Sequence, residues 1–89
     1  MKRSRLEIYF DVLQVIESGV DKPTRIMYRT NLSWVILHDI LETVSNNGFV
    51  EMRIKKKGRK RYYISYKGKR ALSNFRKSIE GLAVISQST

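Results

Sequence analysis

The first apolar pattern in the chain predicts an amphipathic helix from Ser4 to Ser18. Its apolar residues recur at steps of three and four, which places one helical face at Leu6, Tyr9, Phe10, Leu13 and Ile16. Ser4 can cap the first turn, and Glu7, three residues later, can complete a capping box. Gly19 ends the pattern. Acidic residues interrupt the apolar positions at helical spacing, so we interpret this segment as a core helix and not as a secretion signal.

Two further helices are expected between Thr24 and Gly48. Thr24 can cap a short helix with the sequence RIMYRT, which Asn31 ends. Ser33 can cap a longer helix that ends before Gly48. The apolar stripe of this longer helix consists of Leu37, Ile40, Leu41 and Val44. Two helices joined by a short turn form the helix-turn-helix pattern.

After Gly48 the apolar spacing changes from the helical repeat to strict alternation, which predicts a β-hairpin. One face of this hairpin would carry Val50, Met52, Ile54, Tyr62, Ile64 and Tyr66. Gly58 marks the tip, where a run of basic residues gathers. Alternation explains Tyr62 and Tyr66 as core residues, and it leaves Tyr63 facing outward beside the basic strip.

From Lys67 to about Ser86 the helical repeat returns. The a and d positions of a short heptad pattern are occupied by Leu72, Phe75, Ile79 and Leu82. We therefore divide the chain into a domain of residues 1–66, a C-terminal helix of residues 67–86 and a frayed tail of residues 87–89. The apolar stripe could cover the helix's own domain, or it could face a second copy. The continuation of the pattern through Ile85, beyond the reach of a small domain, favours a second copy.

The net charge of +10 lies entirely in the second half of the chain. Residues 1–50 carry six basic and six acidic residues, whereas residues 51–89 carry twelve basic residues against Glu51 and Glu80. Such an asymmetry indicates a polyanionic partner, nucleic acid first and an acidic membrane surface second. A basic run can also be a solvated loop, but the self-repulsion of so many like charges would be relieved by phosphates.

Other classes of function find little support in the composition. The chain has no cysteine, which excludes disulfides and Cys-ligated metals and fits a reducing cytoplasm. No apolar run approaches the roughly 20 residues that cross a bilayer, so the chain is expected to be soluble or at most peripheral. Nucleic acid is the preferred polyanion, and no membrane partner is expected. His38 is the only histidine, and there is no glycine loop for phosphates. We therefore expect no enzyme, no cofactor and no metal site.

Three stretches carry a resemblance to a known family. They are KPTRIMYRTNLSW, a helix ending in GFV, and a hairpin that closes with YYISYKGKRAL. Together they resemble an archaeal family of small winged-helix proteins, which includes transcriptional regulators and Sulfolobus DNA-binding proteins that dimerise through an antiparallel coiled coil. The resemblance extends from about Leu6 to Phe75. Its most specific part is TRIMY-x-x-NLS, whereas the K-G-x-x-x-L opening of the last helix is common to many winged helices.

The resemblance implies an α+β winged helix-turn-helix fold. The third helix, Ser33 to Asn47, would approach the major groove, and the hairpin would form a wing. It also implies a homodimer formed through Leu72, Phe75, Ile79 and Leu82.

Candidate DNA contacts lie on three parts of the chain. On the second and third helices and their turn they are Arg25, Arg29, Asn31, Ser33, Trp34 and His38. On the wing they are Arg53, Lys55, Lys56, Lys57, Arg59, Lys60, Arg61 and Tyr63. The plainer interpretation is that Arg25 and Arg29 are merely solvated and that Trp34 is a lid on the core.

The outward face of the third helix is expected to carry Val35, Asp39, Glu42 and Asn46. Phosphates repel its two carboxylates, so we expect only the N-terminus of this helix to come close to DNA.

The sequence therefore predicts a cytoplasmic, nucleoid-associated protein that binds double-stranded DNA as a homodimer. It would be a transcriptional regulator or a small chromatin-type protein. Two alternatives remain. The acidic third helix would also suit a protein-interaction module, and Tyr63 would suit a binder of RNA or single strands.

Overall fold

The structure is a computed structural model that describes the backbone of residues 3–87 and the side chains up to residue 81. Three helices come first: α1 (Arg5–Glu17), α2 (Pro23–Thr30) and α3 (Trp34–Asn46). The strands β1 (Val50–Ile54) and β2 (Lys60–Ile64) follow, joined by the short turn η1 (Lys56–Gly58). The last element is α4 (Tyr66–Gln87). This is the order that the resemblance implies, and the predicted α+β fold is confirmed.

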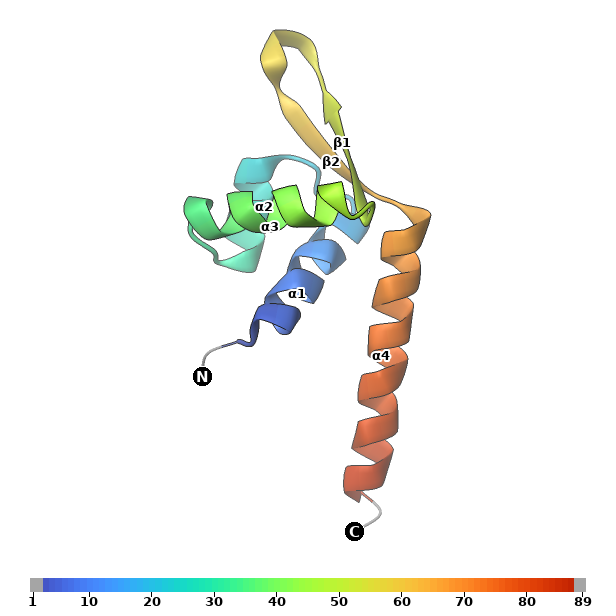
Figure 1. Ribbon diagram of the computed structural model, residues 1–89. Helices are drawn as coiled ribbons and strands as arrows, with labels where there is room; N and C mark the ends of the chain where they lie inside the picture. Colours follow the sequence, from blue (N-terminus) through green and yellow to red (C-terminus); the bar gives the residue numbers. More distant parts are fainter. Residues whose placement is uncertain (1–2, 88–89) are drawn as a thin grey trace.

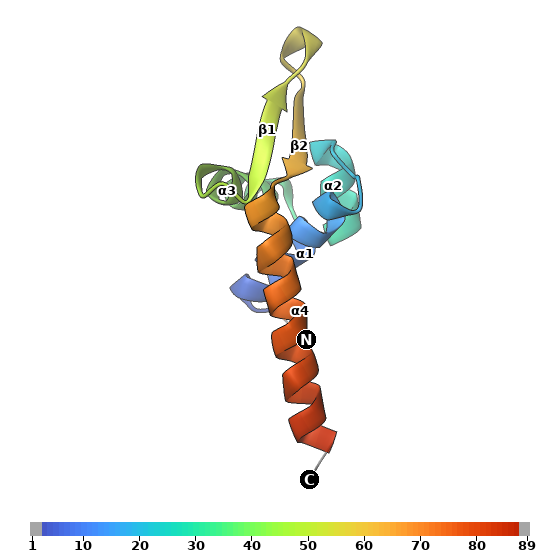
Figure 2. The same ribbon diagram turned by 90° about the vertical axis from the view of Figure 1, so that its right-hand side faces the viewer.

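The hairpin and α4 leave the body of three helices in opposite directions (Figure 1). The view turned by 90° shows the same arrangement, with the hairpin as a narrow projection (Figure 2). The molecule is accordingly elongated, with extents of 56 × 29 × 20 Å. We call the hairpin from Val50 to Ile64 the wing.

The ends of α1 and α3 follow from their capping residues, as predicted. The N–H of Glu7 donates to Ser4 Oγ at 3.1 Å, and the carboxylate of Glu7 accepts from the N–H of Ser4. Ser33 Oγ likewise accepts from the N–H of Ile36 at 3.3 Å. Gly48, with a φ of 77°, follows the end of α3.

The expected cap of the second helix is wrong. The helix begins at Pro23, with the extended residue Lys22 at its N-cap and no side-chain cap hydrogen bond. Proline has no N–H to satisfy and its φ already suits a helix, so Thr24 is not needed as a cap. Asn31 ends α2 as predicted, because it adopts the left-handed conformation with a φ of 56°.

The core joins all three helices to the base of the wing and to the start of α4. The predicted stripe of α3 is confirmed, since Leu37, Ile40, Leu41 and Val44 are all buried. On α1, Leu13 and Ile16 are buried with Val12, whereas Leu6 is exposed. The remaining core residues are Ile26, Val50, Tyr62 and Leu72.

The hairpin is correct in type, but only its base is buried. Val50 pairs with Ile64 at the base, and Ile54 pairs with Lys60 near the tip. Met52 and Ile54 were expected in the core, yet Met52 is 40% and Ile54 66% exposed. The alternation places both residues on the correct face of the hairpin. They are exposed because this part of the wing extends beyond the helices that cover its base.

Tyr66 was predicted as a core residue of the second strand, and this is wrong. It is 76% exposed and begins α4. The change occurs at Ser65, whose Oγ accepts from the N–H of Gly68 at 3.0 Å and thereby caps the helix. Of the three residues expected to fray, Gln87 is the last residue of α4, and residues 88–89 lie outside the described part.

Candidate nucleic-acid interface

The tip of the wing concentrates positive charge in a tight turn. Lys57 and Gly58 both have positive φ, of 62° and 70°, and the N–H of Lys55 donates to the carbonyl of Arg59 at 2.6 Å. The exposed basic side chains of the turn and its flanks are Lys55, Lys56, Lys57, Arg59 and Lys60, while Arg61 is half-buried. No acidic residue lies between Lys55 and Arg61, so the local field is strongly positive.

The outer face of the wing is a cluster around Tyr63. The guanidinium of Arg53 lies 4.5 Å and the ammonium of Lys55 lies 5.8 Å from the centre of its ring. Arg53 also donates to Glu51 at 3.1 Å. A cation over an aromatic face is attracted by the ring quadrupole. Tyr63 therefore contacts two basic side chains of the wing, and the guanidinium of Arg53 lies over its ring.

The acidic face of α3 is partly neutralised from α1. Arg5 donates to Asp39 at 2.7 Å, and this hydrogen bond raises the pKa of the Arg5 guanidinium. Both side chains are well exposed, so the pair adds little to stability. Its electrostatic effect is that Asp39 does not meet a phosphate as a free carboxylate. Sequence analysis missed Arg5, because no local spacing connects residues on separate helices.

The N-terminus of α3 presents apolar residues to solvent. Trp34, Val35 and Ile36 are exposed, and Val35 is 78% exposed. The rings of Trp34 and His38 lie 5.8 Å apart, both exposed. Trp34 is 49% exposed, so about half of its side chain is covered, which is compatible both with a partial lid on the core and with a contact to DNA.

A polar groove of about 240 Å³ separates α3 from the wing. Its walls are formed mainly by His38, Glu42, Ser45, Asn46, Lys60 and Tyr62. Burial raises the pKa of the Tyr62 phenol, which therefore stays uncharged near neutral pH. The hydroxyl of Ser45 is buried and has no hydrogen-bond partner among the described residues.

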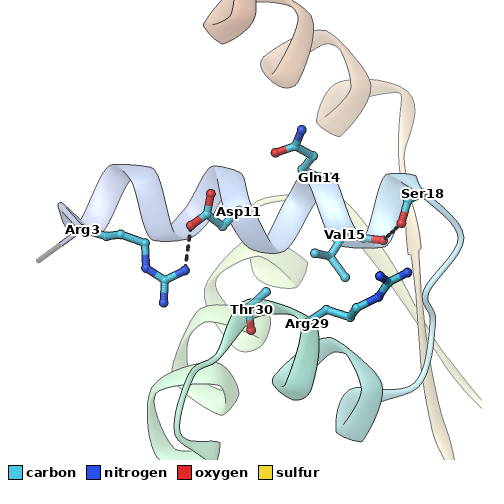
Figure 3. Close-up of a pocket in the computed structure, with 7 residues that line it drawn as sticks. All are labelled: Arg3, Asp11, Gln14, Val15, Ser18, Arg29 and Thr30. Carbon is cyan, nitrogen blue, oxygen red and sulfur yellow. Dashed lines mark hydrogen bonds and ion pairs between the residues drawn. The ribbon is translucent and has the colours of Figure 1, made fainter. Parts of the chain in front are cut away.

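The two arginines of α2 are both exposed, but Arg29 has a particular setting. With Arg3, Asp11 and Ser18 it lines an open cavity of about 500 Å³ between α1 and α2. Arg3 pairs with Asp11 at 2.8 Å, whereas Arg29 extends across the cavity towards the C-terminal end of α1 (Figure 3). Asn31, exposed in the adjoining turn, has a structural role as the left-handed end of α2.

The face of α4 differs from the expected dimer seam. Leu72 is 2% exposed and belongs to the core of its own chain, so it cannot form an interface. Phe75 stacks on Phe10 of α1, with ring centres 3.9 Å apart. Ile79 is 49% exposed. The side chain of Leu82 lies outside the described part.

Residues 3–87 contain neither a membrane-spanning helix nor a group of metal ligands. Over residues 3–87, no helix combines the length and the apolar character needed to cross a bilayer. In the same part of the chain, no three His, Cys, Asp or Glu residues are grouped so that they could hold a metal ion.

Residues 2–82 match the sequence model of a family described as Winged helix-turn-helix. An uncharacterized protein of Methanocaldococcus jannaschii, MJ0287, is 33% identical over 73 residues, which cover 82% of this chain and 70% of the relative.

Solved structures show the same fold. The crystal structure of Sso10a-2, a DNA-binding protein from Sulfolobus solfataricus, is similar with a TM-score of 0.73 and 26% identity, over 97% of this chain and 92% of that one. The MarR family transcription regulator SP03579 gives a TM-score of 0.77 over 92% of this chain and 57% of that one. At 16% identity, this second likeness shows the fold alone.

Proposed function

Because this chain belongs to the winged helix-turn-helix family, we propose that it binds double-stranded DNA, chiefly through phosphates that its wing contacts. The observation that carries the proposal is the tip of the wing, where six basic residues stand within residues 55–61 without an acid. Each basic group that neutralises a phosphate releases condensed counterions, which favours binding without reading the sequence. The likeness to Sso10a-2, which is a DNA-binding protein, supports the same function.

Within this proposal, the second and third helices orient the protein on the duplex. Arg25 is exposed near the N-terminus of α2, where free N–H groups favour an anion. On α3, Ser33, Trp34 and His38 lie at or near the N-terminal end, which we expect to come closest to the bases. Arg29 extends towards α1 (Figure 3), so we give it a weaker role in DNA contact than Arg25.

The charges on α3 favour a protein with weak sequence preference. No lysine or arginine lies between Trp34 and Asn46, and Glu42 is an exposed carboxylate. Arginine and lysine make the commonest specific contacts to guanine, and α3 offers neither. We therefore favour a nucleoid-associated, chromatin-type role in the cytoplasm over the role of a regulator with one operator.

A gel-shift titration tests the proposal. Purified protein should shift a duplex of random sequence at about 50 mM salt, and affinity for a selected site should exceed this by less than about 10³-fold. If duplex DNA gives no shift, the proposal is wrong and a protein-interaction module becomes the better hypothesis. A clear preference for single strands or RNA would point to the other alternative, in which Tyr63 stacks on bases.

We also propose that the protein is a homodimer and that its partner covers the distal part of α4. The helix has 22 residues and continues beyond the body of the domain (Figure 1). Ile79 stands exposed on the same side of the helix as Phe75. The proposed seam therefore consists of Phe75, Ile79 and Leu82, without Leu72.

Ile79→Glu should convert the dimer to monomers, because a pair of carboxylates would be buried at the seam. Sedimentation velocity measures the outcome. Lys77→Glu is the matched control, since Lys77 lies on the opposite side of α4 and is exposed. A dimer that persists in Ile79→Glu would place the interface elsewhere.

A further inference from the structure

Ile54 is an apolar side chain in an unusual place. Along one face of β1, the exposed fraction rises from 3% at Val50 to 40% at Met52 and 66% at Ile54. Ile54 is the last residue of the strand and lies opposite Lys60. The apolar face of the wing thus continues past the point where the described residues can cover it.

The surroundings of Ile54 indicate what covers it. Lys55 follows it in the chain, Lys60 faces it across the hairpin, and the rest of the basic turn lies next to it. A second copy of the wing would bring the same charges and would be repelled. Glu51, the only acid of the wing, already pairs with Arg53. Charge complementarity therefore favours a polyanion that also offers an apolar surface.

The minor groove of duplex DNA combines these two properties. Its walls are phosphates and sugars, and the faces of stacked base pairs are apolar once a step opens. Proteins that bend DNA through this groove commonly combine basic residues with an apolar wedge of Phe, Leu, Ile, Met or Pro. The end of the wing has this composition and is narrow in both views (Figures 1 and 2).

We propose that Ile54 is a wedge that enters the minor groove, partly unstacks one base step and bends the duplex. Lys55 and Lys60 would contact phosphates on either side of it. This inference rests on the proposed DNA binding and adds to it a deformation of the DNA. It also predicts a preference for flexible pyrimidine–purine steps, where unstacking is easiest.

The experiment measures bending and unstacking separately from binding. A duplex of about 30 base pairs carries a fluorophore at each end for energy transfer, and 2-aminopurine at a central pyrimidine–purine step reports unstacking. With the wild-type protein we expect a bend of at least about 20° and a rise in 2-aminopurine fluorescence. Ile54→Ser should lose most of both signals. Its affinity should fall by less than about tenfold, because the phosphate contacts remain.

Two matched variants complete the test. Ile54→Leu keeps a wedge and should keep both signals. Ile54→Lys removes the wedge but adds a charge, so it should bind at least as tightly as the wild type and still lose both signals. All three changes are at an exposed side chain outside the core, and circular dichroism checks that each variant is folded.

The outcomes distinguish this inference from the function on which it rests. A wild-type protein that binds without bending, or an Ile54→Ser variant that bends and unstacks as the wild type does, would overturn the wedge and leave DNA binding intact. Bending that survives while the 2-aminopurine signal is absent in every variant would show that charge neutralisation alone bends the DNA. The absence of any binding would overturn both proposals.

Discussion

Replacing Lys56, Lys57 and Arg59 with glutamine lowers the affinity for duplex DNA by roughly 10³-fold at 50 mM salt and flattens its salt dependence. Each lost phosphate contact removes about 0.9 from the slope of log affinity against log salt, so the slope should fall by about 2.7. Because the two slopes differ, the ratio of wild-type to variant affinity should decrease by about 40-fold when the salt concentration rises from 50 to 200 mM. Fluorescence anisotropy over a salt series measures both quantities.

Glutamine is the appropriate replacement at this turn. Like lysine and arginine it is unbranched at Cβ and polar, although shorter, and it carries no charge. It also introduces no β-branch at Lys57, whose φ of 62° would make a β-branched residue strained. The turn itself rests on the backbone hydrogen bond between Lys55 and Arg59 and on Gly58, which all remain.

A control variant with the same loss of charge distinguishes direct phosphate contacts of the wing from the long-range attraction of the protein's net charge. Lys69, Arg70 and Lys77 are exposed on α4, and their replacement with glutamine also removes three positive charges. We expect this variant to lose less than about tenfold in affinity, through long-range attraction alone. Equal losses in the two variants would show that net charge, and not contact by the wing, causes the binding. An unchanged slope in the wing variant would remove the wing from the interface.

The sequence predicted those features that depend on neighbouring residues. The capping box at Ser4, the end of the second helix at Asn31 and the stripe of α3 are all set within a few residues along the chain, and all three are present. The order of elements followed from the same local patterns and from the resemblance. The excess of basic residues in the wing could also be read directly, because counting charges requires no structure.

The sequence could not show which apolar faces the rest of the chain would cover. Alternation put Ile54 on the inner face of the hairpin, but burial depends on how far the wing extends from the body. Heptad spacing put Leu72 on a seam, yet Leu72 is buried in the core of its own chain, where α4 packs against α1. The pair between Arg5 and Asp39 likewise joins separate helices. In each case the outcome depends on the distance between two helices or strands, and the periodicity of a sequence gives no information about that distance.

At Gly68, α4 approaches the base of the wing very closely. This glycine lies in the first turn of α4, close to Ser65. Ser65 follows β2 in the chain and hydrogen-bonds to Phe49, the residue that precedes β1. The hydroxyl of Ser65 lies 2.8 Å from the carbonyl oxygen of Phe49, and its backbone N–H donates to the same oxygen. A Cβ atom added to Gly68 would meet that oxygen at 2.2 Å and the side chain of Ile64 at 2.6 Å.

The glycine is therefore required by close approach and not by its backbone conformation. Its φ lies outside the positive range that favours glycine elsewhere in this chain. The K-G-x-x-x-L pattern at the start of α4 gains a physical reason in this way. The glycine lets the helix pack against the base of the wing, and the leucine, Leu72, enters the core one turn later.

Gly68→Ala should lower the free energy of unfolding by about 3 kcal/mol, because the clash is with a backbone oxygen that cannot rotate away. For a domain of this size, the melting temperature should fall by about 12–24 °C. Gly81→Ala is the matched control in the same helix, since a Cβ there meets nothing within 4 Å. It should raise stability by about 0.5–1 kcal/mol, through the lower entropy of the unfolded chain. Thermal denaturation followed by circular dichroism compares the two, and equal melting temperatures would mean that α4 does not pack this closely against the base of the wing.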